Sequence, residues 1–189
     1  MDDQTVQEAQ EQQAAAPAQG YELIARHYED TGVLSDAELD TVADVAVRKL
    51  RDILTCFGEG GASIDEFEGD EGELILDVSD GNLAVLIGRH GSTLDAVQLL
   101  VSSLTTKELG FHYPVVVDIE GYKDRRKQKL ASMARSAAAR AKRQHSPVRL
   151  APMNAYERRL VHLALSKDDS VETHSEGEDP RRCVVITAR

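Results

Sequence analysis

The chain has 189 residues and a formal net charge of −11, which is distributed unevenly along its length. Residues 1–80 contain 21 acidic and 4 basic side chains, whereas residues 81–189 contain 12 acidic and 18 basic ones, so the two parts carry −17 and +6. No apolar run approaches about 18 residues, and the chain begins with aspartates rather than with a basic, apolar leader. We therefore expect a cytoplasmic protein without a membrane span, whose C-terminal part attracts nucleic acid.

The N-terminal segment, residues 1–34, is acidic and polar and lacks a stable apolar period, so we expect a disordered tail. Residues 21–29 could add a helical turn or two. Ordered structure is predicted from Ser35, because Ser35 and Glu38 have the spacing of a capping box. The apolar residues that follow recur at helical intervals: Leu39, Val42, Ala43, Ala46, Leu50, Ile53 and Leu54. This pattern predicts a long helix.

Residues 62–67 and 73–78 predict two strands, which an acidic turn containing glycines joins. A short apolar segment at 82–87 precedes a further helix, and residues 114–119 predict a third strand. With the helix that begins after Ser35, the predicted order is αββααβ. This mixture of elements places the segment in the α+β class.

The helix after the segment 82–87 is predicted to begin at Ser92, since Ser92 and Asp95 have the spacing of an acidic capping-box variant. Apolar residues then recur at helical intervals along it. Leu99 and Leu100 widen the apolar face. We therefore expect this helix to be largely buried.

Between these helices lies Ile87-Gly88-Arg89-His90-Gly91, a pair of glycines around two basic or titratable residues. Glycine lacks a Cβ, so the backbone at Gly88 and Gly91 can adopt positive φ and lie close to a sugar-phosphate chain. The free N–H groups of the next helix favour an anion at the same place. A Gly-x-x-Gly pattern alone also occurs at helix C-caps, and His90 could stack on a base, donate one hydrogen bond or have no role.

The segment 123–149 contains ten basic residues and one acidic residue, Asp124. An apolar stripe on the same helix predicts a face packed on a core: Leu130, Met133, Ala134, Ala137, Ala138 and Ala141. On the other faces, the cations can neutralise several phosphates and make binding salt-dependent. We assign this basic patch to Lys123, Arg125, Arg126, Lys127, Lys129, Arg140, Lys142 and Arg143.

A second motif lies on the helix that Asn154 and Glu157 predict, since this pair has the spacing of an N-cap. Arg158 and His162 are four residues apart, which places them on one face about one turn from each other. Arg159 could be a second phosphate contact or an outer salt-bridge partner. From the spacing alone, the helix could equally be an amphipathic one with a solvated basic face, and Arg158 and His162 could also simply stabilise the helix against a sheet.

The residues around the Gly88–Gly91 turn resemble a KH domain in its bacterial, type II arrangement, over about 85 residues. Arg158 and His162 resemble the motif of the R-three-H domain, which is associated with single-stranded nucleic acid. The two motifs in this order resemble the bacterial Jag/KhpB family. The resemblance implies an α+β chain with a type II KH domain at 35–121, followed by a small α+β R-three-H domain at 122–189.

In a KH domain the turn clamps the backbone of about four nucleotides. Carried over to this chain, Gly88 and Gly91 allow the close approach, Arg89 meets phosphate and Ile87 helps to floor the groove. The resemblance further implies an RNA chaperone or post-transcriptional regulator that acts with a small single-KH-domain protein and affects cell-wall growth and cell shape. The alternative is an adaptor that contacts the membrane-protein insertase, which would need an exposed apolar surface.

The sequence contains no evident catalytic constellation. The histidines lie in unrelated contexts, without a Ser-His-Asp or Cys-His arrangement, and Cys56 and Cys183 lack metal-ligand spacing and suit a reduced compartment. The acidic residues at 66–73 lack the regular spacing of a calcium loop, and no lysine and hydroxyl follow Gly91 as in a P-loop. We therefore expect a protein that binds single-stranded RNA, is not an enzyme and holds neither a metal nor another cofactor.

Overall fold

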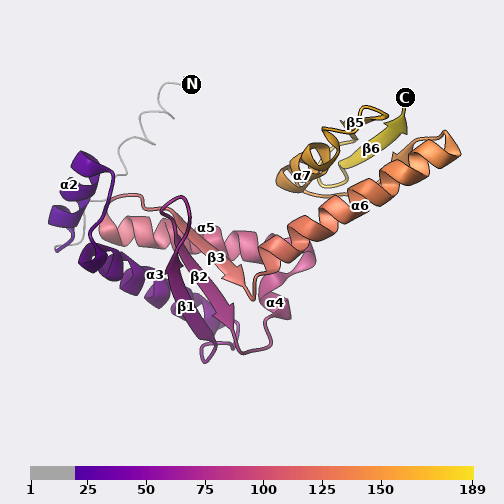
Figure 1. Cartoon of the computed structure of the whole chain (residues 1–189). Helices are drawn as coiled ribbons and strands as arrows, with labels where there is room; N and C mark the ends of the chain where they lie inside the picture. The colour runs from indigo at the N-terminus through magenta and orange to yellow at the C-terminus, as the bar shows by residue number, and fades with distance from the viewer. Residues whose placement is uncertain (1–19) are drawn as a thin grey trace, which may run out of the picture. The chain divides into compact units, whose positions relative to one another are not determined.

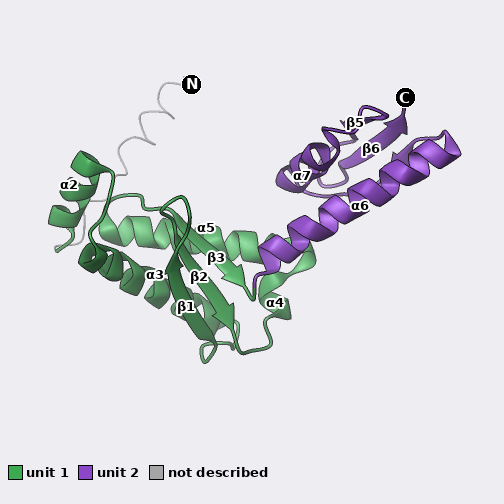
Figure 2. Cartoon of the chain, viewed as in Figure 1, with its two compact units in different colours: residues 1–120 green, residues 121–189 purple. Residues whose placement is uncertain are grey.

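The structure is a computed structural model that describes residues 20–189 (Figure 1). It divides into two compact units, unit 1 (residues 1–120) and unit 2 (residues 121–189), shown in different colours in Figure 2. After its first helix, unit 1 has the elements αββααβ, and unit 2 combines two helices with three strands. The predicted α+β class and the predicted element order are confirmed.

An N-terminal helix, α2 (Glu22–Thr31), lies within the segment that the sequence predicted to be a disordered tail. The ring of Tyr28 lies 5.5 Å from the ring of Phe111 and 5.5 Å from that of Tyr113. These aromatic contacts give the helix a packed face despite its polar composition. The expected helical turns at residues 21–29 are therefore confirmed, whereas the prediction of a disordered tail over residues 1–34 is wrong for this helix. Residues 1–19 of that tail fall outside the described part of the chain.

Helix α3 (Asp36–Cys56) begins where the capping box predicted. The backbone N–H of Ser35 donates to Glu38 Oε2 over 2.9 Å, and Ser35 Oγ donates to the same atom over 2.6 Å. These hydrogen bonds, together with the imidazole of His27 at 2.8 Å, lower the pKa of Glu38 to about 2. One side of the helix is buried: Val42, Ala43, Val45, Ala46, Leu50 and Leu54.

Unit 1 contains a three-stranded sheet in the order β1-β2-β3, formed by β1 (Ser63–Glu68), β2 (Leu74–Ser79) and β3 (Val115–Ile119). β1 is antiparallel to β2, whereas β2 is parallel to β3. Alternate side chains of β2 and β3 are buried, so that one face of the sheet packs against α3 and α5 (Ser92–Leu109) (Figure 1). A parallel pair requires a crossover connection, and in unit 1 that connection carries the Gly88–Gly91 turn.

The crossover consists of α4 (Ala84–Ile87), a 3-10 turn (Arg89–Gly91) and α5. The N-cap of α5 is Gly91, with a φ of 86°, and no side chain caps this end. Ser92 has the helical angles φ −63° and ψ −32°, so it is already inside the helix. The capping box predicted to begin at Ser92 is therefore wrong, because the preceding turn sets the start of α5 by its backbone.

One side of α5 is buried, and the other side carries exposed leucines. The buried residues are Leu94, Val97, Val101, Thr105 and Leu109. Leu99, Leu100 and Leu104 are 67%, 51% and 40% exposed. We refer to these three residues as the α5 leucine face. The prediction of a largely buried helix is wrong, because the described part of unit 1 covers only one side of α5.

Unit 2 contains α6 (Tyr122–Gln144), β4 (Val148–Arg149), α7 (Ala155–Leu165), β5 (Val171–Glu176) and β6 (Cys183–Ala188). Its strands form an antiparallel sheet in the order β4-β6-β5. The predicted apolar stripe of α6 is buried at Leu130, Ala134, Ala137, Ala138 and Ala141, where it meets side chains of α7 and the sheet. Among the described residues, no helix is long and apolar enough to cross a membrane.

Candidate nucleic-acid interface

The Gly88–Gly91 turn is held in its conformation by its own chain. Gly88, His90 and Gly91 have φ values of 68°, 60° and 86°. A Cβ atom at Gly88 would lie 2.0 Å from Oγ1 and 3.0 Å from the backbone N of Thr93. Glycine is therefore required at position 88 both for its positive φ and for the close packing of the turn on the first residues of α5.

The side chains of the turn differ in their exposure. Arg89 and His90 are exposed, and Ile87 is partly buried beside them. Arg89 forms no ion pair with another residue in the described part of the chain, so its guanidinium is available to an anion. The preceding Leu86 is buried and anchors α4 in unit 1. The roles of Ile87, Arg89 and His90 in RNA binding stay predictions.

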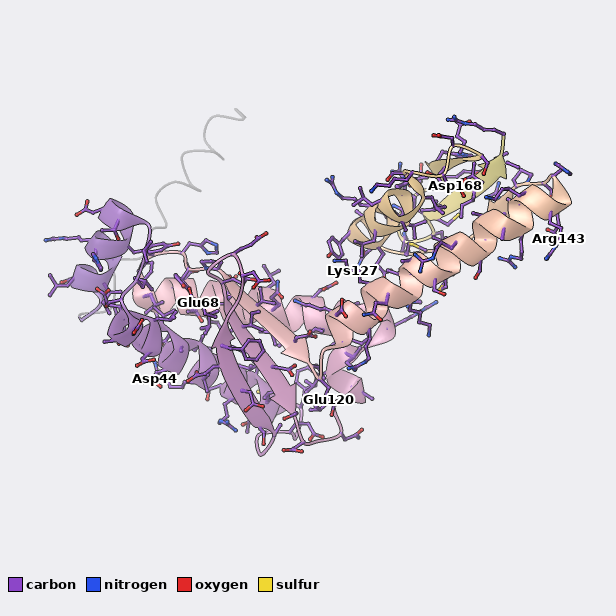
Figure 3. The ribbon with its side chains drawn as sticks, viewed as in Figure 1. Asp44, Glu68, Glu120, Lys127, Arg143 and Asp168 are labelled. Carbon is purple, nitrogen blue, oxygen red and sulfur yellow. The ribbon has the colours of Figure 1, made fainter. Side chains whose placement is uncertain are left out.

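The two units carry opposite charge. Unit 1 has 25 acidic and 6 basic side chains and a formal charge of −19, whereas unit 2 has 8 acidic and 16 basic side chains and a formal charge of +8. Acidic side chains such as Asp44 and Glu68 project from unit 1, and Lys127 and Arg143 project from α6 (Figure 3). At long range a polyanion is therefore attracted to unit 2 and repelled by unit 1.

Arg158 is buried, with 8% of its side chain exposed. Its Nη1 atom donates to the carbonyl oxygen of Met153 over 2.8 Å and to Asp179 Oδ1 over 2.9 Å. These bonds join the start of α7 to the loop between β5 and β6, so the guanidinium stabilises unit 2. The burial of Arg158 contradicts a solvated basic face at this position, and the stabilising interpretation is the better account of this residue.

His162 joins α7 to β5. Its Nδ1 atom lies 2.7 Å from Thr173 Oγ1, and its Nε2 atom lies 3.1 Å from Ser175 Oγ. Burial lowers the pKa of His162, and the proximity of Arg158 and His174 lowers it further. The imidazole is therefore neutral near pH 7, with one ring nitrogen donating and the other accepting. A neutral His162 carries no positive charge, and both of its ring nitrogens already bond hydroxyl groups of β5.

An open hollow of about 620 Å³ lies beside α7. Its lining consists of Ala155, Arg158, Arg159, His162, Leu163, Ser166, Ser175 and Arg182. The structure thus brings together the three residues of the predicted Arg-x-x-x-His site. Arg159 and Arg182 are exposed and form no ion pair with other residues of unit 2, all of which is described.

Sequence reasoning assigned no role to Arg182 or Ser175. Both come from the part of the chain around the loop between β5 and β6, more than ten residues after His162. The basic pair Arg181-Arg182 just before β6 was the available signal. Only the folding of this loop back toward α7 places Arg182 at the hollow.

The structure divides the predicted basic patch into two sets. Four members have partners within the chain: Lys123, Arg125, Arg126 and Lys142. Arg126 Nε lies 2.7 Å from Oε1 of the buried Glu157, and Lys142 Nζ lies 2.9 Å from Asp168 Oδ2, so both cations are paired within unit 2. The other four are exposed, and no ion pair occupies them in the described chain: Lys127, Lys129, Arg140 and Arg143. These four are the members best placed to contact phosphate.

Comparisons with known proteins match both units. The family model "KhpA/KhpB, KH domain" matches residues 48–119, and the model of the R-three-H domain matches residues 128–188. The RNA-binding protein KhpB of Clostridium symbiosum is 35% identical over 150 residues, which cover 79% of this chain and 68% of that protein. The protein of the same name from Lactiplantibacillus plantarum is 35% identical over 150 residues, which cover 77% of this chain and 46% of that protein.

A shorter match of 33% identity over 106 residues links the chain to RNA-binding protein KhpB of Bacillus subtilis and covers 51% of that protein. The chain therefore spans about two thirds of one of these relatives and about half of the other two. The two domain models occur in the order in which the structure places the αββααβ unit and the α7 hollow. The chain belongs to the KhpB family, with a type II KH domain followed by an R-three-H domain.

Proposed function

We propose that the chain binds single-stranded RNA through both units. The observation that carries this proposal is the hollow beside α7, where the unpaired guanidinium groups of Arg159 and Arg182 flank the neutral His162. Guanidinium groups bind phosphate with two parallel hydrogen bonds. The relatives named RNA-binding protein KhpB support the same class of ligand.

Unit 1 provides a second contact in this proposal. The backbone of the Gly88–Gly91 turn approaches the sugar-phosphate chain, and Arg89 meets a phosphate. Because the surrounding unit carries −19, this contact acts at short range and depends on the local cation and on backbone N–H groups. Unit 2 attracts the strand, and the turn then holds about four nucleotides of it.

The cellular role that fits this binding is non-enzymatic. The described residues contain no group of three or more His, Cys, Asp or Glu side chains that could hold a metal ion. The hollow residue His162 already uses both ring nitrogens to bond hydroxyl groups of β5. From the KhpB family to which the chain belongs, we infer a cytoplasmic RNA chaperone or post-transcriptional regulator, which affects cell-wall growth and cell shape through its target transcripts.

The α5 leucine face supports a protein partner in addition to RNA. Exposed apolar groups clustered on one helix are a common feature of interaction surfaces. We propose that the small single-KH-domain protein binds here. The alternative, contact with the membrane-protein insertase, would use the same face. Co-purification of the parent chain and of the variant Leu100→Asp distinguishes the two candidates. The partner is the protein that co-purifies with the parent chain but not with the variant.

RNA binding is tested by fluorescence anisotropy with a labelled single strand of about 12 nucleotides, which exceeds the roughly four nucleotides that a KH turn clamps. Replacing Arg159 and Arg182 together by Ala should weaken binding about 10- to 100-fold, the scale expected for charged hydrogen bonds. Arg89→Asp with His90→Asp should weaken it further, because two carboxylates then face the phosphates.

The matched control is Arg26→Ala, which removes an exposed arginine of α2 outside both contacts. Circular dichroism establishes that each variant is folded. Affinity that stays at the parental value in both the unit 1 and the unit 2 variants would refute RNA binding at these sites.

A further inference from the structure

Helix α7 carries an exposed stripe that combines Arg159 with two apolar residues outside the predicted Arg-x-x-x-His site. Tyr156 is 66% exposed and Leu163 is 55% exposed, and they are the only large apolar side chains exposed in unit 2, whose residues are all described. They are seven residues apart, so they lie on the same side of the helix, with Arg159 on that side between them. We refer to Tyr156, Arg159 and Leu163 as the α7 stripe.

The α7 stripe adjoins the hollow directly. Arg159 and Leu163 belong to both, since each also lines the hollow. On the opposite side of the helix, Val161 and Leu165 are buried in the core of unit 2. Packing within unit 2 therefore gives no reason for an aromatic and an aliphatic side chain at 156 and 163, and the reason is to be sought in what binds there.

To bind one nucleotide of a single strand, a protein needs a cation for the phosphate and an apolar surface for the base. The α7 stripe and its surroundings provide both. Arg159 and Arg182 provide unpaired cations for a phosphate. The Tyr156 ring and the Leu163 side chain provide flat and apolar surface for a base, and stacking of bases on such side chains is tolerant of sequence. At 1.5 Å per residue, the stripe runs about 10 Å along the helix, which exceeds the spacing of about 3.4 Å between stacked bases.

We propose that the α7 stripe stacks unpaired bases of an RNA strand whose phosphate lies in the hollow between Arg159 and Arg182. This inference rests on the proposed RNA binding and adds the origin of strand selectivity. In a duplex, the faces of the bases are covered by their neighbours, so Tyr156 has no base face to contact. Unit 2 therefore prefers single-stranded to double-stranded RNA, and the preference comes from Tyr156 and Leu163 rather than from the arginines.

A protein or a membrane suits this surface less well. Two exposed side chains bury far less area than a stable protein interface of about 1,200–2,000 Å² requires. A membrane-binding helix needs a continuous apolar face, whereas arginine interrupts this stripe at position 159. The alternation of apolar groups and cations matches the alternation of bases and phosphates along a strand.

The test uses the full chain with Tyr156→Trp. Because the sequence contains no tryptophan, this residue is the single indole reporter of the protein. The probes are a single-stranded RNA of about 12 nucleotides and a strand of the same length whose sugars lack bases. We expect the intact strand to quench the indole fluorescence, since a base stacks on the ring, and the abasic strand to leave the fluorescence unchanged while still binding through its phosphates.

The second measurement is the affinity of Tyr156 variants for the intact and the abasic strands. It uses the full chain with Arg89→Asp, which weakens the contact of unit 1 so that unit 2 dominates the binding. Tyr156→Ala should lower the affinity for the intact strand about 5- to 150-fold, and Tyr156→Phe, which keeps the ring, should restore it. Neither variant should change the affinity for the abasic strand. Tyr156→Ala should also reduce the ratio of single-strand to duplex affinity.

These experiments distinguish a failure of base stacking from a failure of RNA binding. If Arg159→Ala and Arg182→Ala weaken binding of both strands while Tyr156→Ala changes neither, base stacking is refuted and RNA binding at the hollow stands. If neither the arginine variants nor Tyr156→Ala alters the affinity, the hollow does not bind RNA and both proposals are refuted there. Equal quenching by the intact and the abasic strands also refutes stacking. If the chain binds an acidic peptide or lipid vesicles, and RNA does not quench the indole fluorescence, RNA is the wrong ligand for the stripe.

Discussion

In the proposed function, the two units bind the same class of ligand by different physical means. Unit 1 carries −19 and presents a strained glycine turn with one available arginine, whereas unit 2 carries +8 and presents a hollow, an exposed stripe and the unpaired cations of α6. Long-range attraction of RNA must therefore come from unit 2. Unit 1 can recognise the shape of the sugar-phosphate chain, because its contact depends on backbone geometry rather than on net charge. The contrast predicts that salt, substitution and pH affect the units differently.

Of the three effects that test this comparison, the largest is expected from removing the unpaired cations of α6. Replacing Lys129, Arg140 and Arg143 together by Gln should weaken RNA binding about 10- to 100-fold at low salt, and should reduce the slope of log affinity against log salt by about 2, since each single-strand phosphate contact contributes about 0.7. The matched control replaces two exposed cations of unit 1, Arg26 and Lys107, by Gln. A slope that both sets lower equally would show that unit 2 has no special part in attracting the strand.

A smaller effect, on stability rather than on binding, is expected at Arg158. Because the guanidinium donates to Met153 and Asp179 from a buried position, Arg158→Ala should lower the free energy of unfolding of unit 2 by about 1–3 kcal/mol. Hydrogen exchange measured by mass spectrometry resolves the two units, and peptides of unit 1 serve as the internal control. Exchange that stays unchanged in α7 and in the loop after β5 would show that Arg158 has no stabilising role.

The smallest effect is a difference in the pH at which each unit loses stability. The pKa of His162 is lowered in the folded chain, so the unfolded chain binds more protons there, and unit 2 loses stability as the pH falls below about 6.5. The pKa of Glu38 is lowered from 4.5 to about 2, so unit 1 loses this contribution only between those values.

Two variants identify the groups responsible for this difference. His162→Gln should flatten the pH dependence of exchange in unit 2, and Glu38→Gln should flatten that of unit 1 at lower pH. Exchange that responds to pH over the same range in both units would contradict the assignment.

Much of the fold was predictable because it depends on local signals. Ser35 and Glu38 interact within one turn, so their spacing alone located the start of α3. Asn154 likewise accepts a hydrogen bond from the backbone N–H of Glu157 over 2.8 Å, as its N-cap spacing indicated. The stripe of α6 was also read correctly, since its period shows directly which side faces a core.

The features that sequence reasoning missed depend on contacts between distant segments. Helical periodicity shows that Leu99 and Leu100 belong to an apolar face, but not whether another element covers that face. Spacing alone could not show whether Arg158 contacts a ligand or stabilises the fold. Only its hydrogen bonds to the carbonyl of Met153 and the carboxylate of Asp179 distinguish these interpretations. Arg182 reaches the hollow only through the return of the chain after β5.

The alanines of α6 have a consequence for how RNA lies on this protein. Alanine has the highest intrinsic helix propensity, and four alanines on the inner side let the neighbouring elements approach closely, so the 23 residues of α6 form a scaffold of fixed length, about 34 Å. Lys129 and Arg143 are consequently held about 21 Å apart along its axis. A flexible basic tail would adapt its charges to any phosphate spacing, whereas α6 sets in advance how long a stretch of strand its cations can contact at once.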